Sequence, residues 1–420
     1  MKTKLQLIAL IWLFSGTSNQ IMAQTLSLDS CYALALNNYP MVRQHDLIEK
    51  SREYTLSNAG KSYLPQVSLT GIVGYIFGGL PVSPENAQSG EDFKLIGIGQ
   101  INQTIWDGGV TKTQKEIISA TAESEKASVE VALYELPSRI NQLYFGILMV
   151  DEQLALLAQR RTVLDHNADR IRQMNEQGLA FKTDLEEVVV EQLKLNQQKT
   201  ESIYVRKGYI LMLSLLTGTE ISEQTQFEKP VDYHLPLEQQ INRPELTLYQ
   251  SQRKLEEARL GMQRVSLMPK VGLLGAGVVL YPEVGLGSGS VSSLGVVGLS
   301  TSWNISGLYK NSNEKYLNQL ALRKLDLQEQ TFRFNLDLQT AQLKSNIDKQ
   351  QAILDEDQEI VDLTKSIREG YQIKYDNGMC SMLDLLDAAE RENEAQTQMA
   401  LHEMQLLMTL YEYRTQTGNQ

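Results

Sequence analysis

Residues 375–390 read Tyr-Asp-Asn-Gly-Met-Cys-Ser-Met-Leu-Asp-Leu-Leu-Asp-Ala-Ala-Glu and lie between two long segments with helical periodicity. The Asn-Gly pair that ends at Gly378 favours a left-handed backbone, which predicts the end of the first helix. Ser381 can cap the second helix by accepting hydrogen bonds from its first amides, and Asp384 follows in the first turn. The stretch therefore predicts a sharp reversal between two long antiparallel helices, with acidic residues just past the bend.

A weaker copy of this stretch lies about 200 residues earlier, a separation at which an internal repeat should be sought. Residues 174–187 read Met-Asn-Glu-Gln-Gly-Leu-Ala-Phe-Lys-Thr-Asp-Leu-Glu-Glu. The corresponding pairs are Gly178 with Gly378, Asp184 with Asp384, and Glu187 with Asp387. The chain therefore contains two related helical hairpins.

Other landmarks recur in the same order through both halves. They are Tyr39-Pro40 with Arg243-Pro244, Leu64-Pro65 with Met268-Pro269, Trp106-Asp107-Gly108-Gly109 with Trp303-Asn304-Ile305-Ser306-Gly307, and Thr217-Gly218 with Thr417-Gly418. An ordered match of this kind predicts a duplicated unit. We expect the first repeat at 24–218, a linker at 219–241 and the second repeat at 242–420.

Composition limits the kinds of protein this chain can be. Only 10 prolines and 7% aromatic residues in 420 residues favour long uninterrupted helices, and a net charge of −12 without a basic patch argues against nucleic-acid binding. The two cysteines, Cys31 and Cys380, form neither a disulfide framework nor a zinc-type spacing, and the four histidines are scattered. No nucleophile motif or phosphate loop is present. We therefore expect no enzyme, no catalytic residues, no cofactor and no metal.

The N-terminus resembles an export signal. Lys2 and Lys4 precede an apolar run, Leu5 to Phe14, and the small residue Ala23 ends the following segment. At about ten residues the run is too short to span a bilayer. We expect a signal peptide at 1–23 and no lipid anchor, because no cysteine follows the cut.

Two segments change from helical to strand periodicity. In the first, apolar residues and glycine alternate with Gln66, Ser68 and Thr70 and fall on one face: Val67, Leu69, Gly71, Val73, Tyr75 and Phe77. A Gly/Pro/Ser-rich loop, 78–91, leads into a second strand that ends at Trp106, so a hairpin is expected at 66–106. A second hairpin is expected at 270–305. Each strand is about as long as a tilted membrane strand.

Helical segments occupy most of the remaining chain. We expect a short helix at 25–38, a second at 41–63, a very long helix at 110–177 with a fault at Pro137, and a return helix at 182–216. In the second half we expect helices at about 310–376 and from the bend to Arg414. The long helix in the first half shows coiled-coil spacing, interrupted by Arg161, at Leu143, Ile147, Val150, Leu154, Leu157, Leu164, Ala168 and Ile171.

A single chain cannot complete a membrane structure from these parts. A lone hairpin leaves its edge amides and carbonyls unpaired, which lipid does not tolerate. Three chains would supply twelve strands, roughly enough for a closed barrel with a lumen. The alternative is a soluble hairpin with one buried face. The coincidence of an export signal, period-2 hairpins and terminal aromatic residues favours the membrane interpretation.

The order of elements resembles the TolC family of outer-membrane efflux proteins over essentially the whole mature chain. The most specific match is Tyr375-x-x-Gly378-x-x-x-x-x-Asp384-Leu385-Leu386-Asp387-Ala388. The resemblance implies a mainly α fold with membrane β-hairpins: a homotrimer in which a twelve-stranded outer-membrane barrel joins a long α-helical barrel across the periplasm. It also implies a periplasmic adaptor (membrane fusion protein) and an inner-membrane RND or ABC transporter as partners.

The same resemblance assigns roles to residues at the helical tips. Asp384 and Asp387 correspond to two aspartates that narrow the periplasmic entrance in well-known members, and Cys380 stands where such members can carry an arginine that helps to close it. Asp184 and Glu187 would form a second acidic set. Gly178 and Gly378 are turn residues to which the resemblance adds adaptor docking.

The residues themselves leave alternatives open at these positions. Asp384 and Asp387 could simply be a solvated acidic first turn stabilised by the helix dipole. Tyr375 could line the entrance or pack against a neighbouring helix. For the whole protein, the first hypothesis is an exit duct for efflux or type I secretion, and the second is a periplasmic coiled-coil structural protein without a channel.

Overall fold

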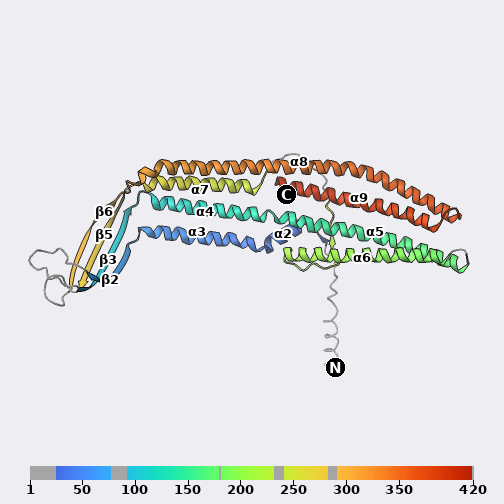
Figure 1. Ribbon diagram of the computed structural model, residues 1–420, viewed down its shortest axis with the longest axis horizontal. Helices are drawn as coiled ribbons and strands as arrows, with labels where there is room; N and C mark the ends of the chain where they lie inside the picture. The colour runs from blue at the N-terminus through green and yellow to red at the C-terminus, as the bar shows by residue number, and fades with distance from the viewer. Residues whose placement is uncertain (1–24, 77–91, 179–180, 231–240, 282–290, 419–420) are drawn as a thin grey trace, which may run out of the picture. The chain divides into compact units, whose positions relative to one another are not determined.

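The computed structural model of the chain describes residues 25–76, 92–178, 181–230, 241–281 and 291–418 (Figure 1). Several predicted segments lie outside these residues: the signal peptide at 1–23, the 78–91 loop with the preceding Phe77, and most of the loop between the second pair of strands. The chain divides into two compact units, and each is described by itself. The helical unit comprises Met1–Val42, Leu133–Asn242 and Leu336–Gln420; the sheet-bearing unit comprises Arg43–Ala132 and Arg243–Asn335.

The sheet-bearing unit contains one four-stranded antiparallel sheet, whose strands lie in the order β2-β3-β5-β6 (Figure 1). The strands are β2 (Gln66–Ile76), β3 (Asp92–Trp106), β5 (Lys270–Tyr281) and β6 (Ser292–Ser302). The helices are α3 (Gln44–Gly60), α4 (Val110–Leu133), α7 (Pro244–Ser266) and the first part of α8 (Gly307–Asp376). Both predicted hairpins are therefore present, and β3 and β5 join them along their length.

One face of this sheet is apolar across all four strands. Leu69 stands opposite Gly99, Val67 opposite Ile101, and the same rows continue through β5 into β6. Cross-strand partners share a face, so the period-2 pattern predicted for β2 extends over the sheet. The large side chains of this face are between 44% and 85% exposed: Val67, Leu69, Val73, Leu95, Ile101, Leu273, Val279, Tyr281, Val297 and Leu299. No element of the described chain covers it.

The chain leaves β3 through a tightly hydrogen-bonded corner. The buried Asp107 carboxylate accepts from the Tyr63 hydroxyl at 2.8 Å and from the amides of Gly109 and Thr111 at 2.9 and 2.6 Å. Burial alone would raise the pKa of Asp107, but these hydrogen bonds outweigh burial and lower it to about 2. A charged Asp107 thus satisfies the first free amides of α4.

The helical unit contains α2 (Leu28–Asn38), α5 (Leu136–Glu176), α6 (Lys182–Thr217), α9 (Met382–Thr417) and the second part of α8. The helix predicted at 110–177 is interrupted: α4 ends at Leu133 and α5 begins at Leu136, with Pro137 in its first turn. The proline ring clashes with the carbonyl four residues earlier, at position 133, and supplies no N–H. The fault predicted at Pro137 is therefore confirmed, and it ends one helix and starts another.

Two short strands were not predicted. Thr25–Leu26 (β1) pairs in parallel with Gln226–Phe227 (β4), so the helix expected at 25–38 begins only at Leu28, where Ser27 caps it. The segment expected to be an irregular linker, 219–241, also contributes β4; its residues 231–240 lie outside the described chain. The expectation of a single helix at 41–63 was also too simple, because 3-10 turns at 40–43 and 61–63 flank α3.

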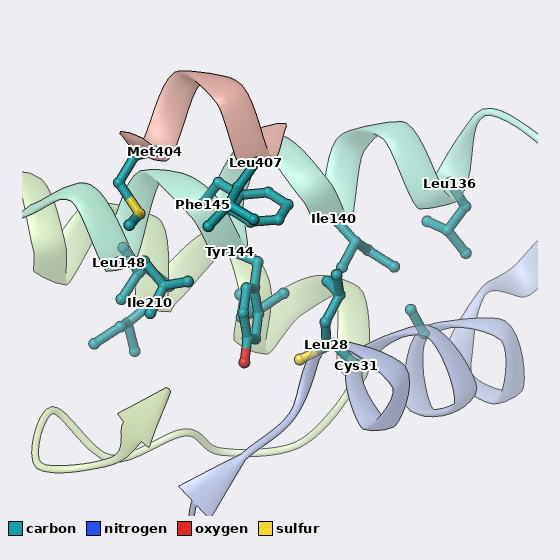
Figure 2. Packing of buried hydrophobic residues seen from close by; sticks show 13 residues of the cluster. Leu28, Cys31, Leu136, Ile140, Tyr144, Phe145, Leu148, Ile210, Met404 and Leu407 are labelled. Carbon is teal, nitrogen blue, oxygen red and sulfur yellow. The ribbon is translucent and has the colours of Figure 1, made fainter. Parts of the chain in front are cut away.

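The main core lies where α2, α5, α6 and α9 meet. Figure 2 shows Tyr144 between Leu28 and Cys31 of α2 on one side and Met404 and Leu407 of α9 on the other. The Tyr144 hydroxyl lies 2.8 Å from the Leu26 carbonyl oxygen and 2.7 Å from the Glu228 carbonyl oxygen, so its one proton can be donated to either. The core therefore fixes the β1–β4 pair as well as the helices.

Both return helices end on a left-handed glycine packed against an asparagine. Gly218 has φ 68° and Gly418 has φ 81°. At the end of α6, the side-chain amide of Asn38 donates to the carbonyls of Leu215 and Leu216. At the end of α9, the backbone N–H of Asn242 donates to the Thr417 carbonyl at 3.1 Å. We call these the closing turns.

Candidate entrance site

The turn between α8 and α9 is built entirely from local hydrogen bonds. Gly378 has φ 71°, and the Met379 amide donates to the Lys374 carbonyl at 2.8 Å, which closes α8. The Asp384 amide donates to Ser381 Oγ at 3.2 Å, while the Ser381 amide donates to the Asp384 carboxylate at 2.8 Å. This reciprocal pair is a capping box. The hydrogen bonds from Ser381 hold the pKa of Asp384 below its usual range.

The turn between α5 and α6 has half of this arrangement. Gly178 is left-handed, with φ 74°, and its amide donates to the Asn175 carbonyl at 2.9 Å. The Asp184 carboxylate accepts from the Phe181 amide at 3.0 Å, as Asp384 accepts from Ser381. Phe181 has no hydroxyl to return a bond, so the Asp184 amide lacks a side-chain acceptor from the cap. We call this and the preceding turn the tip turns.

Behind the tip turns, α5, α6 and α9 enclose a groove of about 930 Å³. It brings together three of the acidic residues predicted for the entrance: Glu187 from α6 and Asp384 and Asp387 from α9. Asp184 does not line the groove, although its neighbour Thr183 does. The two helical hairpins thus contribute carboxylates to one surface within a single chain.

The charges in the groove are unevenly compensated. Asp387 pairs with Arg391 at 2.7 Å, and both side chains are mostly exposed. Arg160 from α5 lies between Glu191, at 3.4 Å, and Glu390, so it links α5 to α6 and to α9. Within the described chain, Glu187 has no ion-pair partner. The groove therefore keeps a negative surplus that the ion pairs do not remove.

Tyr375 and Cys380 lie beside the groove rather than in it. Tyr375 packs against the apolar cluster around Leu385, with its hydroxyl 3.8 Å from the Met174 sulfur. The Arg170 guanidinium from α5 lies 5.3 Å from the Tyr375 ring and binds Asp376 at 2.5 Å. Cys380 Sγ is 3.6 Å from the Tyr371 carbonyl. Neither Cys380 nor Cys31 is in a disulfide.

Sequence reasoning missed the two arginines that connect the hairpins. Arg160 and Arg170 reach partners more than 200 residues away in the chain, Glu390 and Asp376. No periodicity or spacing marks such a pair, because the contact exists only once the hairpins have packed. The arginines were visible in the sequence only as charged residues on a long helix.

Among the residues that the structure describes, no group of three or more His, Cys, Asp or Glu side chains is placed to hold a metal ion. No helix in the described ranges is long and apolar enough to cross a membrane. What the site has is a negatively charged groove next to two turns.

No protein-family model and no curated protein matches this chain. The fold does have counterparts. The outer-membrane channel OprN matches with a TM-score of 0.70 and 15% identity, covering 94% of this chain and 90% of the channel. The outer-membrane channel CmeC of Campylobacter jejuni matches with a TM-score of 0.66 and 15% identity, covering 93% of this chain and 85% of CmeC. CusC, whose structures concern folding and transmembrane channel formation, matches with a TM-score of 0.70 and 13% identity, covering 94% of this chain and 92% of CusC.

These matches define the class of protein at the level of its fold. This chain has the mainly helical fold of the TolC-family outer-membrane channels, as its sequence predicted. The compared proteins are channels of bacterial outer membranes, and the predicted location of this chain agrees with theirs.

Proposed function

We propose that this chain is one protomer of a homotrimeric outer-membrane exit duct that extends into the periplasm. In this role it serves a tripartite efflux or type I secretion system as a passive channel and catalyses no reaction. Its partners are two further copies of itself, a periplasmic adaptor, an inner-membrane RND or ABC transporter, and outer-membrane lipid.

The observation that carries this proposal is the uncovered apolar face of the sheet. Ten large apolar or aromatic side chains stand exposed on one face of four strands. At roughly 25 cal/mol per Å², leaving such a face in water would cost many kcal/mol. The edge strands β2 and β6 also have only one neighbour each within the described chain. Three copies joined edge to edge would pair these edges and turn the apolar face toward lipid.

A stripe on α8 supports the trimer independently. Leu317, Leu320, Leu327 and Phe334 are 56% to 63% exposed. Their spacing of three and seven residues is that of a helix-packing seam, and no helix of the described chain covers it. A neighbouring protomer would bury this stripe. Coiled-coil packing would then occur between protomers as well as within one chain.

The duplicated unit fits the same proposal. Each half contributes one hairpin to the sheet and one pair of long helices, with the predicted 219–241 segment between them. The periplasmic coiled-coil alternative explains the helices but leaves the apolar sheet face without a use. We therefore retain the duct.

The tip turns would form the periplasmic entrance. In a trimer, the carboxylates of Asp384 and Asp387 from three chains would surround one axis, with Glu187 and Asp184 further out. Tyr375 and Cys380 would support this ring from behind. Gly178 and Gly378 would shape the tips that meet the adaptor.

Cell fractionation tests the location and the trimer. We expect the protein in the Sarkosyl-insoluble membrane fraction, migrating as a trimer in SDS until it is heated. A monomer in the soluble periplasmic fraction would contradict the proposal and favour the coiled-coil alternative.

Planar-bilayer recording tests the entrance. The double variant Asp384→Asn, Asp387→Asn removes the charge and keeps an oxygen for the Ser381 bonds. We expect lower cation preference and weaker block by multivalent cations, because fewer negative charges surround the axis. Glu201→Gln, which removes a carboxylate of α6 outside the groove, is the matched control. If the double variant has the cation preference and the multivalent-cation block of the wild type, these aspartates are only a solvated helix start.

A further inference from the structure

The groove between α6 and α9 has apolar walls as well as charged ones. Its floor is the buried Leu164 of α5. Three apolar side chains stand exposed along it: Val163 at 47%, Val190 at 49% and Leu383 at 60%. They come from α5, α6 and α9 respectively, so an occupant could contact apolar surface on three helices. A groove that only repelled anions would not need these side chains.

Acidic groups outnumber basic ones around these apolar walls. The lining includes six carboxylates, those of Glu186, Glu187, Glu191, Asp384, Asp387 and Glu390. The lining includes only two basic residues, Arg160 and Lys194, and both are already paired with Glu191, at 3.4 and 2.6 Å. Outside the lining, Arg391 pairs with Asp387 at 2.7 Å and Lys182 with Glu186 at 2.8 Å. Within the described chain, Glu187 and Asp384 are therefore the lining carboxylates that have no ion-pair partner. The groove is therefore complementary to a group that is apolar in its body and positive in charge.

We propose that this groove binds one amphipathic organic cation, with its apolar part against Val163, Val190 and Leu383 and its charge near Glu187. Ligand sites for small molecules have volumes of about 300–1,000 Å³, a range that includes the 930 Å³ found here. This inference deepens the proposed function, since it names the substrate class of the entrance. Binding itself does not depend on whether the protein conducts.

A small cation fits this groove better than a basic helix from a partner protein. A helix about 10 Å across would fill the volume within roughly two turns, too short a segment for stable helical recognition. A bare metal ion would gain nothing from the exposed valines and leucine. The carboxylates act over a longer range: one about 6 Å from a cation raises its local concentration about threefold in a water-like dielectric.

Equilibrium dialysis with the purified full-length protein in a non-ionic amphipathic polymer tests the proposal. The probe is tetraphenylphosphonium, compared with tetramethylammonium, which has the charge alone, and triphenylphosphine oxide, which has the aromatic body without charge. We expect saturable binding of tetraphenylphosphonium at one site per chain. Both reference compounds should bind at least about tenfold more weakly, since each lacks one of the two contributions.

Matched variants locate the site. Glu187→Gln should weaken tetraphenylphosphonium binding about threefold through the lost charge, and Val190→Ser about fivefold through the lost apolar contact. Their controls are Glu201→Gln and Val189→Ser on the same helix, which lie outside the groove and should bind like the wild type.

Several outcomes would overturn the inference. Equal binding of tetramethylammonium would show that the negative charge alone attracts the ligand. Equal binding of the phosphine oxide would show that the ligand only adsorbs on apolar surface. Equal losses in the control variants would place binding elsewhere. Binding at these residues by a basic helical peptide but not by tetraphenylphosphonium would assign the groove to a protein partner. Each result can be obtained with a trimer that fails to conduct, so the duct proposal is tested separately.

Discussion

The tip turns and the closing turns use the same backbone conformation for different purposes. Gly178 and Gly378 at the tips, and Gly218 and Gly418 at the closing turns, all have φ between 68° and 81°. A Cβ added at either tip glycine would meet nothing within 4 Å. At Gly218 it would lie 2.3 Å from the Asn38 side chain, and at Gly418 2.2 Å from the Asn242 carbonyl oxygen. The tip turns require glycine only for its left-handed backbone conformation. The closing turns also require it because a neighbouring asparagine leaves no room for a side chain.

The two cysteines should show the largest difference between these regions. Cys31 is fully buried in the core near the closing turns, and burial raises the pKa of its thiol to about 12. Cys380 lies at a tip and is only partly buried. We expect a maleimide at neutral pH to modify Cys380 at least about 1,000-fold faster, because Cys31 needs both local unfolding and ionisation. Peptide mass mapping over time measures both rates. Comparable rates would mean that the core around α2 opens readily.

The turn glycines should differ next. Gly418→Ala adds a clash with backbone to left-handed strain, so we expect a loss of about 3 kcal/mol or more in stability. Gly378→Ala adds strain alone and should cost about 1 kcal/mol. Gly218→Ala should fall between them, because the Asn38 side chain can move at the cost of its hydrogen bonds. Thermal unfolding followed by circular dichroism gives the order. A Gly378 variant as unstable as the Gly418 variant would remove the distinction.

Much of this architecture could be predicted because its signals are local. Gly378 and Ser381 mark a turn and a cap within a few residues, and the alternation around Leu69 marks a strand. The β1–β4 pair could not be predicted in this way, since a two-residue strand has no periodicity. Its partners, Leu26 and Phe227, are brought together by a tertiary core instead.

The tip turns should also differ from each other through their caps. Ser381→Ala removes one half of the capping box at the start of α9 and should cost about 1 kcal/mol. At the other tip, Phe181→Ser would supply the missing hydroxyl to the Asp184 amide and should stabilise the start of α6 by up to about 1 kcal/mol. Hydrogen exchange of the first-turn amides reports each change locally. Faster exchange in the Phe181 variant would show that its aromatic ring matters more than a cap.

The smallest expected effect is the pH response of the entrance. Hydrogen bonds from Ser381 hold the pKa of Asp384 below the usual aspartate range. Asp384 therefore stays charged at pH values where an ordinary aspartate begins to be protonated, and it loses its charge only as the pH falls through its lowered pKa. If the chain forms the proposed channel, its cation preference should persist at about pH 4.5, near the ordinary carboxylate range. The Ser381→Ala variant should lose more of it there. Reversal potentials in a salt gradient measure the preference, and identical curves for the two proteins would contradict the assigned cause.

The candidate site was predictable in part, for a related reason. Asp384 and Asp387 belong to a compact motif, so a resemblance could assign them. The groove that joins them to Glu187 depends on how α5, α6 and α9 pack, which no single segment encodes. Arg160 is the clearest case, because its partners come from two other helices.

The β1–β4 pair also sets an order of events during maturation. Thr25 and Leu26 find their hydrogen-bonding partners only at Gln226 and Phe227, and Tyr144 joins both segments. A chain exported from its N-terminus must therefore deliver more than half of its length before its first strand can form. Closing so long a loop is slow relative to helix formation. Under the export that we propose, the start of the mature chain would stay accessible to chaperones and proteases until then, and the pairing would end that exposure.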